Sequence, residues 1–242
     1  MAGFALSMYR ECKYAFLIVA IIALPLWATE GPITLERFEG DVQVRQGVAE
    51  EWSDIVPGLK LRPEDTIRTG RNGSAVLRRD DGIRYSIPPE TIIDGADLRN
   101  IDREELLLLL AMEDMLSVPD RINGDRPAPR TTVLHGSPRG RMSGEVIASD
   151  PMTAQFRING ARFLINQNYH GTAVLKIRET LRLFPAGEYR TDAMMIAAES
   201  FESMELFEEA SRYYRTVLDE STNADTRRVA GTRLERINER TE

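Results

Sequence analysis

The sequence predicts a multidomain β + α protein, in which a small all-β domain is followed by an array of helical hairpins. Residues 39–97 alternate apolar and polar side chains in short runs that end at glycine-centred turns, which is typical of β-strands. Residues 152–239 lack this alternation, and their apolar side chains recur three or four residues apart, as in helices. Residues 119–151 are rich in proline, glycine and arginine, which favours a linker between the two parts.

The chain of 242 residues therefore divides into five predicted segments, and its length suits one or two domains. These segments are a signal peptide or signal anchor (1–28), an all-β domain (30–98), a connecting helix (99–118), a linker (119–151) and a helical domain (152–242). The hydrophobic content of 42% is enough for ordinary cores.

The run from Ile83 to Ile87 shows the clearest strand alternation. Period two places Ile83, Tyr85 and Ile87 on one face and Arg84 and Ser86 on the other. Tight turns need residues that tolerate a positive φ. Residues predicted to serve this purpose precede the strand: Asp81-Gly82, and one turn earlier Gly70, Asn72 and Gly73.

Five segments of the strand region follow one another in a characteristic order: Gly40-Asp41-Val42-Gln43-Val44, Gly58-Leu59-Lys60-Leu61, Asp65-Thr66-Ile67-Arg68-Thr69-Gly70, Ser74-Ala75-Val76-Leu77 and Asp81-Gly82-Ile83. This series resembles the FecR domain, a bacterial exported module, over about a quarter of the chain. At Pro63-Glu64-Asp65 the family often has a glycine before the aspartate, so the local turn is in doubt. The resemblance implies an exported binding or sensing module without catalytic activity.

The N-terminal segment has the order of charges and apolar residues found in secretory signals. Arg10 and Lys13 precede an apolar run at 14–28, and a cut after Ala28 is compatible with its small residues. Fifteen residues are fewer than the roughly 20 that a membrane helix needs. Two alternatives stay open: cleavage of the signal peptide, and an uncleaved segment 14–28 that anchors the protein in the inner membrane. Either one exports residues 30–242, so we predict a periplasmic or otherwise exported protein.

Composition excludes several classes of function. The net charge is −7, and removing residues 1–28, which carry two basic and one acidic residue, would make it −8. An acidic protein is a poor candidate for sequence-independent nucleic-acid binding. The single cysteine, Cys12, precedes the apolar run, so a processed chain would contain no disulfide and no thiol chemistry.

The connecting helix begins with a predicted capping box, in which Asp102 accepts a hydrogen bond from the Glu105 amide and the Glu105 carboxylate reaches back. The apolar stripe at 106–112 continues at Met115 and Leu116. Two interpretations stay open: a helix packed on the rest of the protein, and a helix that binds a partner or dimerises. The arginines of the following linker could meet an anionic surface or remain solvated, and 131–134 and 145–148 are possible short strands.

The C-terminal region reads as helix pairs with small and aromatic side chains at regular places. In one unit these are Ala198, Phe201, Ala210 and Tyr214, and in the preceding unit they are Ala161, Leu164, Ala173, Ile177 and Pro185. This pattern resembles tetratricopeptide repeats, which implies a groove that binds a peptide or protein. Two units and a closing helix are short for such an array. We therefore expect support from the linker, the strand domain or a second copy, with a simple helical bundle as the alternative.

No set of residues in the sequence predicts catalysis. The two histidines are His135 in the linker and His170 between helices, and Ser137 near His135 does not lie in a nucleophile elbow. Asp80-Asp81 fits hairpin-turn chemistry better than a cation site. We predict no enzyme activity, no metal and no cofactor.

Two functional hypotheses follow. The first is a cell-envelope adaptor or scaffold that binds a protein through its helical repeats and a wall component, glycan or second protein through its FecR-like domain. The alternative is a FecR-type envelope sensor or regulator, although 13 residues before the apolar run are too few for a cytoplasmic domain. Neither involves nucleic acid, and the membrane is involved only through an uncleaved N-terminus. The candidate partner-binding residues, on the inner-groove face of the helical domain, are Tyr169, Arg178, Arg182, Tyr189, Arg190 and Tyr213.

Overall fold

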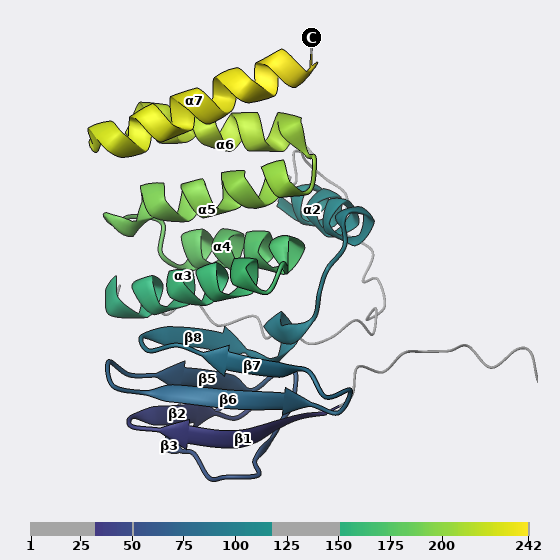
Figure 1. The fold of residues 1–242 in the computed structure, drawn as a ribbon, viewed down its shortest axis with the longest axis vertical. Coiled ribbons are helices and arrows are strands. Elements are labelled where there is room, and N and C mark those ends of the chain that lie inside the picture. Colours follow the sequence, from purple (N-terminus) through teal and green to yellow (C-terminus); the bar gives the residue numbers. More distant parts are fainter. Residues whose placement is uncertain (1–31, 50, 118–150, 242) are drawn as a thin grey trace, which may run out of the picture. The chain divides into compact units, whose positions relative to one another are not determined.

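The computed structural model describes residues 32–49, 51–117 and 151–241, and Figure 1 shows the order of their elements. Residues from Pro32 to Glu242 form one compact unit. The predicted signal segment lies outside the described residues. So do most of the predicted linker and its two possible strands, together with His135 and Ser137.

The described part is a mixed β plus α fold, as predicted, with two antiparallel sheets followed by six α-helices. The strands are β1 (Ile33–Glu39), β2 (Val42–Arg45), β3 (Ser53–Asp54), β4 (Lys60–Leu61), β5 (Thr66–Thr69), β6 (Ser74–Arg79), β7 (Arg84–Ile87) and β8 (Thr91–Asp94). After the 3-10 helix η1 (Gly95–Leu98) come α2 (Arg103–Ser117), α3 (Pro151–Asn166), α4 (His170–Leu183), α5 (Tyr189–Ser203), α6 (Phe207–Glu220) and α7 (Ala224–Thr241).

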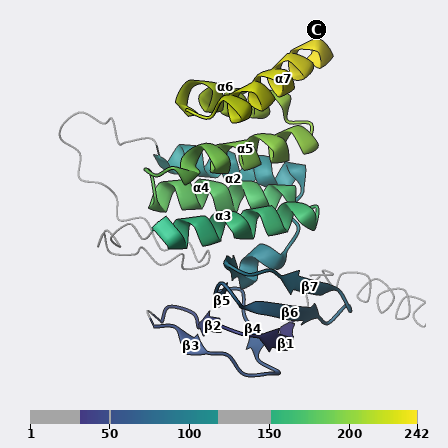
Figure 2. The same cartoon turned by 60° about the vertical axis from the view of Figure 1, so that its left-hand side comes forward.

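The eight strands form two four-stranded sheets with the orders β4-β1-β6-β7 and β3-β2-β5-β8 (Figure 2). Apolar residues lie opposite each other on neighbouring strands. Leu77 lies opposite Tyr85, and Val44 lies opposite Ile67. All four side chains are buried in one hydrophobic core to which both sheets contribute. The alternation of apolar and polar residues therefore determines which side of each sheet faces the core.

Strand β7 confirms most of the predicted alternation. Tyr85 and Ile87 are fully buried, while Arg84 and Ser86 are exposed. The prediction was wrong for Ile83, which is 40% exposed. Ile83 precedes the strand and belongs to the hairpin turn, where its carbonyl accepts a hydrogen bond from the Arg79 amide at 2.9 Å, so the strand periodicity does not extend to it.

Glycine is required in the predicted turns for two different structural reasons. Gly82 has the expected positive φ of +89° in the β6–β7 hairpin, whereas the prediction was wrong for Asp81, which does not have a positive φ. Gly70, Asn72 and Gly73 do not have a positive φ, so this part of the prediction was wrong. Gly70 and Gly73 are instead needed for close approach, because a Cβ on either would overlap atoms of Asp41 where the chain crosses between the sheets.

Asp65 organises the turn at Pro63-Glu64-Asp65 that the sequence left in doubt. Its side chain is buried and accepts hydrogen bonds from the amides of Gly47 and Arg62, each at 2.9 Å. The carboxylate thus satisfies two backbone donors that would otherwise be unpaired, and it joins the β2–β3 loop to the start of β5.

Helix α2 confirms half of the predicted capping box. The Glu105 amide donates to Asp102 Oδ1 at 2.8 Å. The Glu105 carboxylate does not reach back to the backbone, because it pairs with Arg99. Leu106 and Leu110 are buried on the side of α2 that packs against α4, so the first interpretation of this helix holds for that side.

Helices α3 to α7 confirm the five predicted helices, and each packs against the next in the chain. The small residues Ala161, Ala173, Ala198 and Ala210 are completely buried, which allows neighbouring helices to approach closely. Phe201, Tyr214, Leu164 and Ile177 fill the space between them and are almost completely buried. In the described part, no helix is both long enough and apolar enough to cross a membrane.

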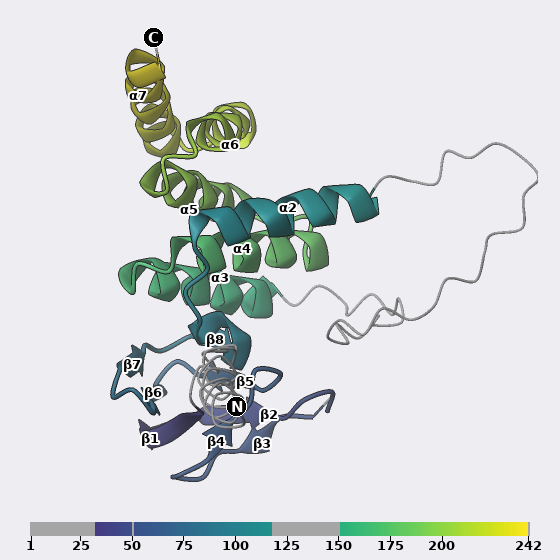
Figure 3. The same ribbon diagram turned by 90° about the vertical axis from the view of Figure 1, so that its right-hand side faces the viewer.

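The helices do not stand apart from the strands. Helix α3 packs on β8, the edge strand of one sheet (Figures 1 and 3). Gly160 in α3 permits this contact, because a Cβ there would overlap the carbonyl oxygen of Ile92. Gly171 in α4 does the same beside the carbonyl of Ile101. The short helical array is therefore supported by the strand region, one of the three forms of support that we expected.

The contact between α3 and β8 predicts an unusual response to glycine replacement. Gly160→Ala should lower the free energy of unfolding by about 1–3 kcal/mol, because the added methyl group meets backbone atoms that cannot rotate away. In the control Gly231→Ala, the nearest atom is Leu218 Cδ2 at 3.9 Å, and higher helix propensity should add about 1 kcal/mol. Denaturant unfolding measures both. Effects of the same sign would contradict a special need for glycine at 160.

Candidate functional site

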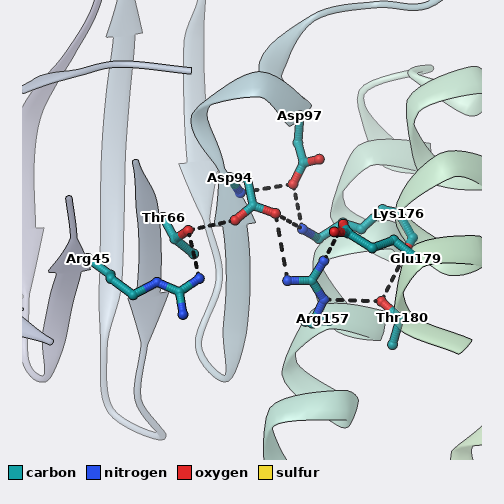
Figure 4. A network of polar contacts seen from close by, with 8 residues as sticks. All are labelled: Arg45, Thr66, Asp94, Asp97, Arg157, Lys176, Glu179 and Thr180. Atoms are coloured by element: carbon teal, nitrogen blue, oxygen red, sulfur yellow. Dashed lines mark hydrogen bonds and ion pairs between the residues drawn. The ribbon is translucent and has the colours of Figure 1, made fainter. Parts of the chain in front are cut away.

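A network of buried charges joins β8 and η1 to helices α3 and α4 (Figure 4). The side chain of Lys176 has no exposed surface, and its ammonium group lies 3.1 Å from Asp94 Oδ2 and 2.5 Å from Asp97 Oδ2. Asp97 Oδ2 also accepts a hydrogen bond from the Asp94 amide at 2.8 Å. One lysine from the helices therefore satisfies two carboxylates from the strand region.

Arg157 of α3 extends the network on the helical side. Its guanidinium lies 3.8 Å from Asp94 Oδ2 and 2.6 Å from Glu179 Oε2, and it donates to Thr180 Oγ1 at 3.3 Å. On the strand side, the Thr66 hydroxyl donates to Asp94 Oδ1 at 2.7 Å. Asp94 is thus the shared acceptor of groups from β5, α3 and α4.

The two aspartates respond to burial differently. Burial raises the pKa of Asp94, but Lys176 and Arg157 outweigh it and hold the pKa well below its usual value. For Asp97, burial outweighs the attraction of Lys176, and the nearby Asp94 charge adds to it, so the pKa is raised. Asp94 is therefore the better-stabilised anion of the pair.

This network is a structural joint. Its two cations and three carboxylates pair with one another, and the ammonium group of Lys176 lies between the two aspartates. Across the described ranges, no group of three or more His, Cys, Asp or Glu residues could hold a metal ion. The chemical effect of the network is to fix α3 and α4 against β8.

A pocket with a volume of about 420 Å³ lies between α4, the beginning of α5 and α6. Its lining combines four arginines with a tyrosine, a threonine and two apolar side chains: Arg178, Leu181, Arg182, Arg190, Met194, Arg212, Tyr213 and Thr216. Four of the six predicted partner-binding residues, Arg178, Arg182, Arg190 and Tyr213, thus come together there. Arg212 and Thr216 were not predicted, although Arg212 directly precedes Tyr213 and Thr216 follows it by three residues.

Glutamates hold three of the pocket arginines in place. Arg178 Nε lies 3.1 Å from Glu113 of α2, and Arg190 binds Glu220 through two nitrogen atoms at 2.6 and 3.2 Å. Arg212 pairs with Glu209 at 3.1 Å. Arg182 is exposed and has no ion-pair partner within the part of the chain that the structure describes. The pocket therefore has guanidinium groups that are positioned before any partner arrives.

The other two predicted residues lie outside the pocket. Tyr189 is buried, and its hydroxyl donates to the carbonyls of Ala186 and Phe184 at 2.7 and 3.2 Å. Tyr169 is half-buried beside the strand region, with its hydroxyl oxygen 3.0 Å from that of Tyr85. Both residues connect neighbouring segments of the protein in this structure.

The sequence analysis also missed a cluster around Trp52. The guanidinium carbons of Arg68 and Arg45 lie 4.5 and 5.3 Å from the centre of the Trp52 ring, within the range of cation–π attraction. Arg45 also contacts Thr66 at 3.4 Å, which links this cluster to Asp94. The only signal in the sequence was an isolated tryptophan between strands that carry arginine.

The remaining candidate groups have structural surroundings. Asp81 pairs with Arg79 at 2.7 Å and accepts the Ile83 amide at 3.0 Å, which is the predicted hairpin-turn role. His170 begins α4, where burial lowers its pKa and its Nδ1 atom has no hydrogen-bond partner in the described structure. No nucleophile or acid–base partner accompanies it among the contacts of the described residues.

Comparison with models of known protein families gives no match, and no curated protein is significantly similar in sequence.

Because the pKa values of Asp94 and Asp97 shift in opposite directions, we expect neutralising each residue to change the stability by a different amount. Asp94→Asn should lower the free energy of unfolding at pH 7 by about 3 kcal/mol, because it leaves Lys176 and Arg157 undercompensated in a buried site. Asp97→Asn should cost less than half as much, because the Asp97 carboxylate gains less than its burial costs. Urea unfolding of both variants beside the wild-type chain gives this comparison.

The same pair predicts a dependence on pH. A depressed pKa contributes stability above the unfolded value of about 4, and this contribution is lost as the pH falls further. The deficit of Asp94→Asn should therefore shrink below about pH 4. The raised pKa of Asp97 works in the opposite direction, because its burial cost is relieved as the carboxyl takes up a proton. A deficit of Asp94→Asn that does not change with pH would contradict this assignment.

Proposed function

We propose that this chain is an exported, non-enzymatic adaptor of the cell envelope that binds a protein through the pocket on its helices. The observation that carries this proposal is the composition of the pocket. Arginine and tyrosine line it together with Leu181 and Met194. Arginine, aromatic residues and methionine are enriched in the cores of protein interfaces, and arginine and tyrosine are common among the residues that dominate binding energy.

The ion pairs around the pocket favour a binding site over a set of arginines that are simply exposed to solvent. Because Glu113, Glu220 and Glu209 already position three guanidinium groups, a partner would meet them in a fixed arrangement. Preorganisation reduces the entropy lost when side chains are ordered on binding. Arg182, which has no ion-pair partner among the described residues, supplies a charge-assisted donor for a partner.

An adaptor needs a second contact, and we place it on the strand region at the Trp52 cluster. Trp52 is partly exposed and is flanked by two arginines. The resemblance of residues 39–97 to FecR domains supports a binding role for this region, whose ligand would be a wall component, a glycan or another protein. The buried joint at Lys176 would keep the two contacts in a fixed relation.

A sensor or regulator of the FecR type is the second candidate function. The observation that favours it is the chain of contacts from the Trp52 cluster through Arg45, Thr66 and Asp94 to Lys176 in α4. A ligand that moved Arg45 would disturb an acceptor that both parts share. A ligand-dependent change in the protection of α4 in hydrogen exchange would support this function over a passive adaptor.

Export is part of the proposal and rests on the N-terminal pattern of charge and apolar residues. Cell fractionation with intact-mass measurement tests it. A mass that begins near Thr29 in a soluble envelope fraction supports a diffusible adaptor, and a full-length mass in the membrane fraction supports an anchored one. Full-length protein in the cytoplasm would contradict both.

The adaptor function predicts position-specific cross-linking in the cells that make the protein. A photo-reactive residue in place of Arg182 should give a covalent adduct with a partner, because this position lines the pocket. The same replacement at Arg215, an exposed arginine on α6 outside the pocket, is the matched control and should give none.

Adding Arg190→Ala to the photo-reactive chain should reduce the adduct about tenfold, which is the effect of losing one strong interface side chain. Circular dichroism confirms that this chain remains folded. An adduct at 215 as strong as at 182, or one that Arg190→Ala leaves unchanged, would show that the pocket is not the binding site.

A further inference from the structure

Helix α2 has a second apolar side that the rest of the described structure leaves uncovered. Leu106 and Leu110 are buried against the protein, whereas Leu107, Leu108, Met112 and Met115 are 38%, 61%, 49% and 69% exposed. Four of the nine large exposed hydrophobic residues among the described ranges thus belong to this one helix. We call the set of Leu107, Leu108, Ala111, Met112 and Met115 the α2 stripe.

The α2 stripe runs along one line of the helix. Leu108 and Met115 are seven residues apart, which is two helical turns, so they lie one above the other. Ala111 and Met112 lie between them, to either side of that line, and Leu107 extends the stripe at its N-terminal end. No charged residue occurs from Leu106 to Met112. A continuous apolar surface of this kind on an otherwise charged protein indicates an interaction site.

The helix is held firmly enough to present this surface. On its other side, Leu106 and Leu110 pack toward α4, and Glu113 pairs with Arg178 of α4 at 3.1 Å. Figure 3 shows α2 lying along α4. The stripe is therefore a ridge of side chains on the side of α2 that faces away from α4, and such a ridge packs into the grooves of another helix.

We infer that the α2 stripe pairs with the α2 stripe of a second copy of this chain, with the two helices antiparallel. The stripe is self-complementary in this orientation. A two-fold axis between Ala111 and Met112 places Leu108 of each copy opposite Met115 of the other, and the small Ala111 lets the helices approach at the centre. The antiparallel arrangement also opposes the two helix dipoles favourably.

The surface chemistry supports a second copy as the occupant. Glu113 stays outside the seam because it is already paired with Arg178, so pairing buries no unpaired charge from that residue. The other described helices together expose only Met152 and Leu183 as large apolar residues, so no other helix within the described ranges has a face of this kind. A closed two-fold contact of identical surfaces follows.

The size of the stripe sets the strength of the contact. Four exposed side chains provide less than the roughly 800 Å² per partner that a standard interface buries. The dimer is therefore weak and depends on concentration. It should be visible by light scattering of the full chain as a rise in average mass with concentration, and Leu108→Glu should abolish that rise.

Cysteine cross-linking tests both the contact and its direction. In a full chain with Cys12→Ser, which removes the only natural cysteine, Leu108→Cys/Met115→Cys should form a covalent dimer on mild oxidation. The two new cysteines cannot pair within one chain, because two helical turns exceed the reach of a disulfide. Each single variant should cross-link at least about tenfold more slowly, since its cysteines would be two turns apart in the antiparallel dimer. Mixing the two single variants should restore the dimer.

Leu183→Cys is the control for random collision, because Leu183 is as exposed as Leu107 but lies on α4. Thermal unfolding followed by circular dichroism confirms that each variant is folded. A double variant that cross-links no faster than Leu183→Cys would overturn the proposal and assign the stripe to a different partner. Single variants that cross-link as fast as the double variant would contradict the antiparallel arrangement.

Discussion

The buried ammonium of Lys176 is the interaction on which the arrangement of strands and helices depends. Apolar contacts and the close approach at Gly160 also hold α3 against β8. The charges add a further requirement, because a shift that separated Lys176 from Asp94 and Asp97 would leave its ammonium group, which has no exposed surface, without both carboxylates. The joint therefore contributes more to the uniqueness of the arrangement than to its total stability.

This constraint explains how a short helical array and a small strand region form one compact unit. Neither part is large, and two helical hairpins with a closing helix have few internal layers. The strand region supplies the missing neighbour, with β8 covering α3 and the segment at Ile101 covering the start of α4. A pocket on α4, α5 and α6 and a tryptophan cluster on the strands then belong to one compact unit.

Much of this fold could be predicted from the sequence, because alternation and helical spacing are local signals. The burial of Tyr85 and Ile87 and the five C-terminal helices follow from these signals directly. The joint could not be predicted in this way, because Lys176 looks like an ordinary surface lysine and its partners lie 79 and 82 residues away. Glu105 was predicted to complete its own helix cap, but its carboxylate pairs with Arg99, a nearby residue outside the capping pattern.

The candidate site was predictable only by residue type. Arginine and tyrosine in the helical region suggested six residues, and helical spacing brings four of them to one pocket. Residue type cannot separate tyrosines that bind a partner from those that pack, and Tyr189 and Tyr169 satisfy their hydroxyls within the protein. Glycine is ambiguous in the same way. Gly82 is needed for its positive φ, whereas Gly73 is needed because other atoms approach its Cα closely.

Helix α2 connects these conclusions, because its sequence from Leu106 to Met112 is apolar on all sides and cannot itself indicate which side is buried. The structure resolves this ambiguity: α4 covers Leu106 and Leu110, and the α2 stripe remains. Pairing of two stripes would bring two pockets and two tryptophan clusters into one assembly. Two linked sites strengthen a weak contact with a repetitive surface, because the second binding event becomes intramolecular. A weak dimer is therefore consistent with an adaptor whose individual contacts are modest.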